Sequence, residues 1–147
     1  MSIRYGIIGA GMMGCEHIRN ILQIEGADIT AIADINEKSL NWGINACGDK
    51  FSPKVFNNYQ ELLKQDDIDA VVVATPNFSH IDVMREVFKT NKHVLLEKPM
   101  CTNLKDAKEV MESSKTHKGV VWIGLEYRYM TTISEALKNL ESVGNIK

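Results

Sequence analysis

Short apolar runs alternate with segments of helical spacing along most of this chain. The runs predict strands at residues 5–8, 28–34, 55–56, 68–74, 93–96 and 120–124. The run from Ile68 to Ala74 is continuous and rich in β-branched residues, which is typical of a strand covered on both faces. Strict alternation of strands and helices predicts right-handed crossovers. We therefore expect an α/β fold, a doubly wound parallel sheet of about six strands in three α/β/α layers.

The segments between these runs carry apolar residues at helical spacing, which predicts inward faces. Helices are expected at 36–47 and 59–64, after Gly14, around 81–91, and between Thr102 and Gly119. The residues expected to face inward are Gly14, Ile18, Ile21 and Leu22; Leu40, Ile44 and Cys47; Ile81, Met84, Val87 and Phe88; and Leu104, Ala107, Val110 and Met111.

Polar residues at the helix starts suggest caps. Asn77 or Ser79 can cap the helix near residue 81, and Thr102 can cap the next helix. The sequence Thr132-Ile133-Ser134-Glu135 has the form of a capping box for a last amphipathic helix. That helix either begins a further part of the molecule or packs back onto the sheet.

Composition narrows the class of protein. The 147 residues suffice for one domain, the net charge is −2, and Lys and Arg are dispersed, so we expect neither nucleic acid nor a membrane as partner. Cys15, Cys47 and Cys101 are far apart and predict free thiols, and we expect no metal site. Without a signal peptide or a membrane-spanning run, a soluble cytoplasmic protein is expected.

The segment Gly9 to Gly14 reads G-x-G-x-x-G, directly after the first strand and directly before a helix. Gly9 allows a tight turn, and Gly11 leaves the main chain open to a pyrophosphate. The backbone amides of Met12 and Met13 would face the phosphates at the positive end of the helix dipole. This context predicts a dinucleotide site rather than an ordinary glycine-rich turn.

Asp34 ends the second predicted strand, about twenty residues after the glycines. A carboxylate here can accept hydrogen bonds from both ribose hydroxyls and repels a 2′-phosphate, which favours NAD over NADP. Lys38 is a nearby cation that could soften this preference. The alternative is that Asp34 is a solvated cap of the next helix.

Two later strand ends carry candidate chemistry, since ligands of open α/β sheets bind beyond the carboxyl ends of the strands. One strand ends in Thr75-Pro76-Asn77, with His80 in the next helix, and a lone His there is more often structural. The other ends in Glu97-Lys98-Pro99. In a partly dry pocket Lys98 could hydrogen-bond a substrate hydroxyl and help move its proton, although an exposed surface Lys is the alternative.

These motifs together resemble the N-terminal half of the Gfo/Idh/MocA oxidoreductases. The resemblance rests on Gly9 to Gly14, Asp34, Ala74 to Asn77 with His80, and Lys92 to Pro99. Tyr127-Arg128-Tyr129 and Leu140 to Gly144 resemble that family's entry into a second domain.

The resemblance implies a dehydrogenase for a sugar, cyclitol or related polyol, homo-oligomeric when full-length. It makes Lys98 the catalytic lysine, places Glu97 and residues Thr75 to Asn77 along the nicotinamide side with His80, and gives Arg128 a part in shaping the site. We expect residues 1–125 to be a Rossmann domain that binds NAD. Residues 126–147 would begin a connection to a substrate domain beyond this chain, so little or no turnover is expected from these residues alone.

Two other functions fit the same sequence. One is a non-catalytic NAD-binding sensor or regulatory domain, which has no chemical need for Lys98. The other is a structural partner that assembles through an uncovered sheet edge and the last helix.

Overall fold

The structure is a computed structural model that describes residues 2–139. Six strands form one sheet in this part of the chain, in the order β3-β2-β1-β4-β5-β6, and every pairing is parallel. The strands are β1 (Ile3–Ile8), β2 (Ala27–Ala33), β3 (Lys54–Phe56), β4 (Ala70–Val73), β5 (His93–Leu96) and β6 (Val121–Ile123). The expected doubly wound sheet is thus confirmed.

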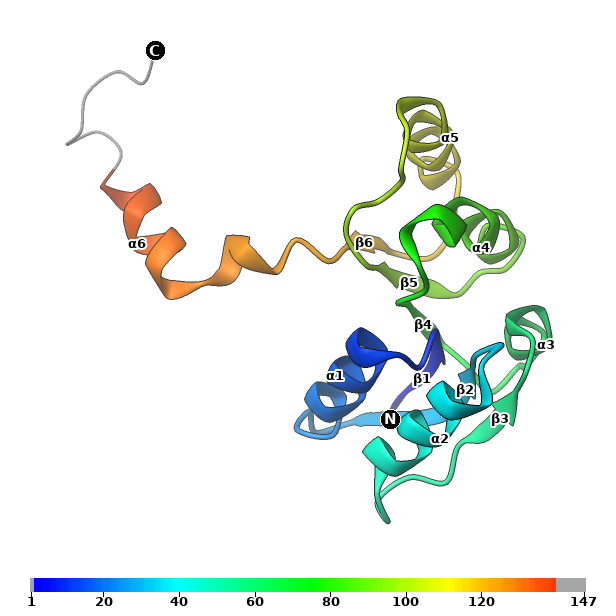
Figure 1. The fold of residues 1–147 in the computed structure, drawn as a ribbon. Coiled ribbons are helices and arrows are strands. Elements are labelled where there is room, and N and C mark those ends of the chain that lie inside the picture. The colour runs from blue at the N-terminus through cyan, green and yellow to red at the C-terminus, as the bar shows by residue number, and fades with distance from the viewer. Residues whose placement is uncertain (1, 140–147) are drawn as a thin grey trace.

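Helices cover both faces of the sheet (Figure 1). The helices are α1 (Met12–Ile21), α2 (Glu37–Cys47), α3 (Tyr59–Leu63), α4 (His80–Val87), α5 (Leu104–Ser114) and α6 (Thr131–Lys138). One apolar core joins α1 and α2 to the sheet, and the other joins α3, α4 and α5 to its opposite face. The fold therefore has three α/β/α layers.

The apolar faces agree with the predicted stripes in α1 and α4 but not everywhere. Ile18, Ile21, Met84 and Val87 are buried. In α2 the predicted inward residue Ile44 is 39% exposed, although Leu40 and Cys47 are buried.

The predicted inward face of α5 is wrong in part. Val110 is buried, but Leu104 is 70% and Met111 48% exposed. This helix covers the end of the sheet, where β6 has only three residues, so there is too little sheet to bury a full stripe.

The predicted caps are corrected as well. Asn103, not Thr102, caps α5 by accepting from the Asp106 amide. Among the described residues no side chain caps α4, and the Ser79 hydroxyl instead donates to the Pro76 carbonyl at 2.7 Å and lies 3.0 Å from the Thr75 hydroxyl oxygen. The expected capping box in α6 does not form, since that helix starts at Thr131 with no side-chain cap.

The segment after β6 leaves the sheet. It forms a short 3-10 turn, η2 (Glu126–Tyr129), and then α6, which lies away from the sheet in Figure 1. The Tyr129 ring stacks on Trp122 of β6, with the ring centroids 6.0 Å apart. The alternative that the last helix packs onto the sheet is therefore wrong. The predicted feature at 140–144 lies outside the described residues.

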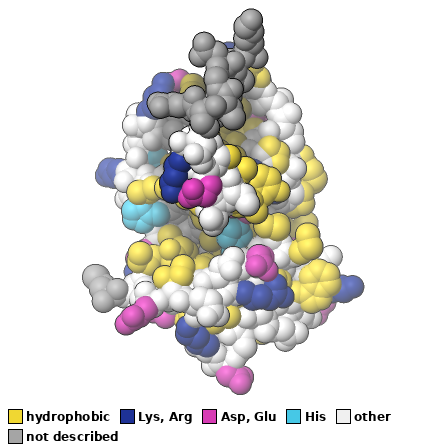
Figure 2. Space-filling view, turned by 90° about the vertical axis from the view of Figure 1, so that its left-hand side faces the viewer, with side chains coloured by type: hydrophobic (Ala, Val, Ile, Leu, Met, Phe, Trp, Pro, Cys, Tyr) yellow, Lys and Arg dark blue, Asp and Glu magenta, His cyan; other side chains and the backbone are white. Residues whose placement is uncertain are grey.

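Surface charge, helix apolarity and the state of the cysteines are the features that the composition led us to expect. On the face in Figure 2, the described Lys and Arg side chains are scattered among acidic and hydrophobic ones rather than gathered into a patch. Within residues 2–139, no helix has the length and apolarity needed to cross a membrane. All three cysteines are free thiols, as predicted.

Candidate functional site

A cavity of about 640 Å³ opens at the carboxyl ends of β1, β2 and β4. Seven of the predicted cofactor residues line it. They are Gly9, Gly11, Met12, Met13, Asp34, Thr75 and Pro76. Parallel strands bring these residues, far apart in sequence, to one edge of the sheet, as the topology requires.

The glycine turn, which is the segment Gly9 to Gly14, is shaped by close backbone contacts. Gly9 has φ of 92°, and a side chain there would come 2.6 Å from the Ala74 carbonyl oxygen. A Cβ on Gly14 would overlap the Gly9 carbonyl oxygen, so α1 can approach the turn only with glycine at this position. Gly9 and Gly14 therefore build the turn.

Gly11 differs from its neighbours because a Cβ placed on it would meet no atom of the described residues within 4 Å. The protein does not need a glycine here for its own packing. The open space lies in the cavity wall at the first residue before α1, where the first helix amides lack intrahelical partners. The turn thus offers bare main chain and free amide donors, which fits an anionic pyrophosphate.

Asp34 lies at the end of β2 and touches the glycine turn directly. Its Oδ2 accepts from the Ala10 amide at 2.8 Å, and its Oδ1 accepts from the Asn36 amide at 2.9 Å. The cap of α2 is Asn36, whose side chain accepts from the Ser39 amide. The alternative of Asp34 as the helix cap is therefore wrong, and the carboxylate faces the cavity with lone pairs to spare.

Glu97 and Lys98 follow β5 next to this cavity. Val73 of β4 pairs with Leu96 of β5, and the Glu97 amide donates to the Val73 carbonyl at 2.9 Å. The end of β5 therefore lies beside the end of β4, where the segment Thr75-Pro76-Asn77 begins. Neither Glu97 nor Lys98 lines the cavity itself. The Lys98 side chain is 44% exposed, and its Nζ lies 3.7 Å from Oε1 of Glu126.

His80 lies between the segments that follow β4 and β5. Its ring is fully buried, with Nε2 3.0 Å from the Thr75 carbonyl oxygen and Nδ1 3.0 Å from that of Pro99. It does not line the cavity. The structure thus supports the structural alternative for His80 and not contact with a cofactor. Asn77, in the 3-10 turn η1 (Asn77–Ser79), is likewise absent from the cavity wall.

Sequence reasoning missed several side chains around the site. Ile35 and Phe78 line the cavity although they are 91% and 74% exposed, so they form an apolar rim. Their positions directly after Asp34 and Asn77 are the signal that could have identified them. His17 was also missed, and its imidazole lies 2.7 Å from Glu97.

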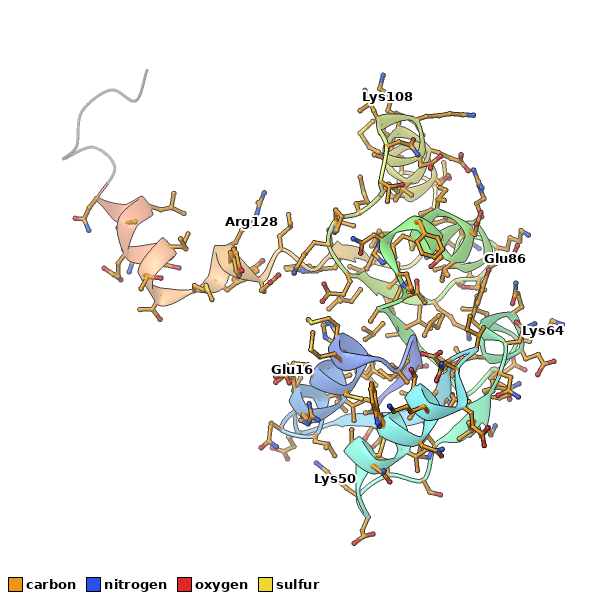
Figure 3. The ribbon with its side chains drawn as sticks, in the orientation of Figure 1. Glu16, Lys50, Lys64, Glu86, Lys108 and Arg128 are labelled. Carbon is orange, nitrogen blue, oxygen red and sulfur yellow. The ribbon has the colours of Figure 1, made fainter. Side chains whose placement is uncertain are left out.

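Arg128 lies on the segment between β6 and α6. Figure 3 shows it on η2, with its side chain directed away from α1. Its expected part in shaping the site stays a prediction.

Comparison with known proteins gives the same picture. Residues 3–125 match the family model described as oxidoreductase family, NAD-binding Rossmann fold. The inositol 2-dehydrogenase of Salmonella paratyphi B is 31% identical over 150 residues, which cover 99% of this chain and 43% of that enzyme. The glucose-6-phosphate 3-dehydrogenase of Bacillus subtilis is 31% identical over 97% of this chain and 40% of its own length.

A solved structure agrees in fold. The myo-inositol dehydrogenase of Lactobacillus casei, in complex with NAD(H) and myo-inositol, superposes with a TM-score of 0.88 at 28% identity. The match covers 97% of this chain and 42% of that protein. The chain therefore spans about two fifths of the length of these relatives.

Proposed function

The chain belongs to the Gfo/Idh/MocA oxidoreductase family, and we propose that it is the cofactor-binding half of an NAD-dependent dehydrogenase for a sugar, cyclitol or related polyol. The observation that carries this proposal is the cavity whose wall joins the glycine turn to Asp34. Bare backbone and helix amides suit a pyrophosphate, and a carboxylate one strand away suits the hydroxyls of a ribose.

The preference for NAD over NADP is part of the proposal. A ribose 2′-phosphate would lie close to the Asp34 carboxylate and be repelled by it. Lys38, the cation that could offset this repulsion, has its Nζ 5.2 Å from the centroid of the Trp42 ring on the same helix. That contact supports a Lys38 that faces its own helix rather than a phosphate.

Lys98 is the catalytic residue of the proposal. When NAD is bound, its nicotinamide supplies the hydride acceptor or donor. Lys98 would hydrogen-bond the substrate oxygen: its neutral amine would accept the hydroxyl proton as the carbonyl forms, and its ammonium group would donate a proton to that oxygen as the carbonyl is reduced. Its half-exposed position beside the carboxylate of Glu126 leaves it accessible to a substrate.

The substrate class is inferred from relatives whose names give inositol or glucose 6-phosphate as substrates. We propose residues 1–125 as the cofactor domain and 126–147 as the start of a connection to a substrate domain. A homo-oligomeric full-length protein and a cytoplasmic location stay predictions.

Titration with NADH and NADPH tests the proposal. We expect energy transfer from Trp42 or Trp122 to bound NADH to give a dissociation constant in the micromolar to millimolar range, with NADPH at least about tenfold weaker. Equal affinity for both would contradict the role of Asp34. Absence of binding up to millimolar NADH would contradict the proposal as a whole.

A further inference from the structure

A histidine and a glutamate join α1, the helix that begins in the glycine turn, to the end of β5, just before Lys98. His17 lies on α1, and its Nε2 is 2.7 Å from Oε1 of Glu97, which directly follows β5. The two side chains are only 19% and 9% exposed. No other described side chain of α1 makes a side-chain hydrogen bond to the end of β5.

Glu97 is fixed on every side. Its Oε2 accepts from the Lys98 amide at 3.1 Å, and its own amide donates to the Val73 carbonyl. A Cβ on Gly124 would lie 3.5 Å from Oε1, so the carboxylate also rests against the chain that leaves β6. His17 is thus the only described side chain that donates a hydrogen bond to this nearly buried carboxylate.

The chemistry of this pair gives His17 a positioning task. A nearly buried carboxylate is stable only when its oxygens are hydrogen-bonded. Nε2 of His17 is the donor, which also fixes the orientation of the ring. Without His17, Oε1 would lack its partner, and the carboxylate would turn toward water or draw solvent in. The Lys98 amide would then lose its fixed acceptor.

We infer that His17 is a positioning residue that, through Glu97, holds the Lys98 end of β5 in place against the helix that binds the pyrophosphate. The inference rests on the proposed function, because it assumes that phosphates lie at the glycine turn and nicotinamide at the end of β5. His17 itself does not line the cavity and acts only through Glu97.

ADP-ribose separates the two ends of the site, because it has the adenine, both riboses and the pyrophosphate but no nicotinamide. We compare the affinities of the 147-residue chain for NADH and ADP-ribose in the wild type, in His17→Leu and in His17→Gln. His17→Leu should lower the ratio of NADH to ADP-ribose affinity at least about fivefold, with ADP-ribose binding nearly unchanged. His17→Gln, whose amide can donate from nearly the same place, should restore most of the ratio.

Three outcomes would overturn the inference. An unchanged ratio in His17→Leu would show that the pair does not influence the nicotinamide end. Equal weakening of both ligands, or failure of His17→Gln to restore the ratio while it folds normally, would show a merely structural contact. If the wild type bound neither ligand, the proposed function itself would fail, which is a result distinct from those three.

Discussion

The Asp34 carboxylate carries two backbone hydrogen bonds, one from Ala10 in the glycine turn and one from Asn36 at the start of α2. It therefore shapes the turn, and in the proposed function it also accepts hydrogen bonds from the ribose hydroxyls. A substitution can separate these two tasks, because Asn retains one acceptor oxygen but loses the charge.

We predict that Asp34→Asn narrows the preference for NADH over NADPH by about tenfold, since the charge that repels the 2′-phosphate is gone. Its unfolding midpoint should fall by no more than about 5 °C. Asp34→Ala should lose the preference for NADH over NADPH and should be less stable than Asp34→Asn, because it also removes the acceptor of both backbone hydrogen bonds. Fluorescence titration and thermal unfolding measure the two effects, and an unchanged preference in Asp34→Asn would rule out the charge as its cause.

A second carboxylate, Asp69, lies before β4 and binds Arg4 of β1. Arg4 donates to it from Nε at 2.9 Å, from Nη2 at 2.7 Å and from its backbone amide at 2.9 Å. The Arg4 side chain, and then its amide, lower the pKa of Asp69 from 3.8 to about 2. A lowered pKa in the folded state stabilises the protein above the unfolded value, and that contribution is lost as the pH falls from about 4 through about 2.

We predict that Asp69→Asn flattens the loss of stability between pH 4 and pH 2, because it removes the group that titrates there. The effect is modest, since the pair is more than a third exposed and is screened by solvent. Urea unfolding across this range measures it. Asp49→Asn, on an exposed residue, is the control, and an identical acid loss in Asp69→Asn and the wild type would contradict the prediction.

At the residue scale, the sequence predicted positions whose role is set by local backbone geometry. Gly9 and Gly14 are of this kind, since their neighbours in the turn decide which residue fits. Buried polar partners could not be predicted in this way. His17 and Glu97 are 80 residues apart, and only the folded sheet brings them together.

Among the elements, α1 depends most on close approach to the sheet. Gly14 lies in its first turn, where any Cβ would overlap the Gly9 carbonyl oxygen. The helix packs on the sheet through Ile18 and Ile21 behind that contact. Displacing the helix start would therefore disturb both the turn and the core.

We predict that Gly14→Ala destabilises the protein by about 2 kcal/mol or more, because the backbone must shift to admit the methyl group. Chemical denaturation gives the free energy of unfolding. Ser114→Ala, near the end of α5 and away from the turn, serves as a helix control of small effect. Stability of Gly14→Ala equal to that of the wild type would show that the helix start has room to move.

The apolar pattern predicted the order and type of the elements. It did not always predict which face of a helix is buried. The continuous run in β4 was read correctly because a fully covered strand is apolar on both faces. The buried face of α5 was predicted wrongly in part, because the apolar pattern does not show that this helix lies over a short last strand. The cap of α5 was misplaced by one residue because Thr102 and Asn103 are adjacent and both are of types found at helix starts, and the structure selects Asn103.

At the scale of the whole molecule, the described residues form the three-layered fold and a segment after β6 that leaves the sheet. Within the described residues, η2 and α6 contact each other, and the Tyr129 ring meets Trp122 on β6. Several large apolar side chains of this segment are exposed, among them Tyr127 at 65% and Leu137 at 56%. All the described residues that line the cavity precede residue 84.

We predict that a chain of residues 1–125 folds and binds NADH within about twofold of the 147-residue chain, because no residue of the cavity wall is removed. Its unfolding midpoint should change by only about 5 °C, from the loss of the Tyr129 ring on Trp122. Calorimetry and NADH titration of both chains test this. A shorter chain that fails to fold, or binds much more weakly, would show that residues 126–147 belong to the domain.

The most direct test of the phosphate site is Gly11→Ala. Within residues 2–139 no atom lies within 4 Å of the added methyl group, and the backbone at Gly11 is extended, so thermal unfolding should be nearly unchanged. Because the methyl group would occupy the place of the pyrophosphate, affinity for both NADH and ADP-ribose should fall at least about tenfold. Wild-type affinity for both ligands in a stable Gly11→Ala variant would contradict the account, since the phosphates would then lie elsewhere.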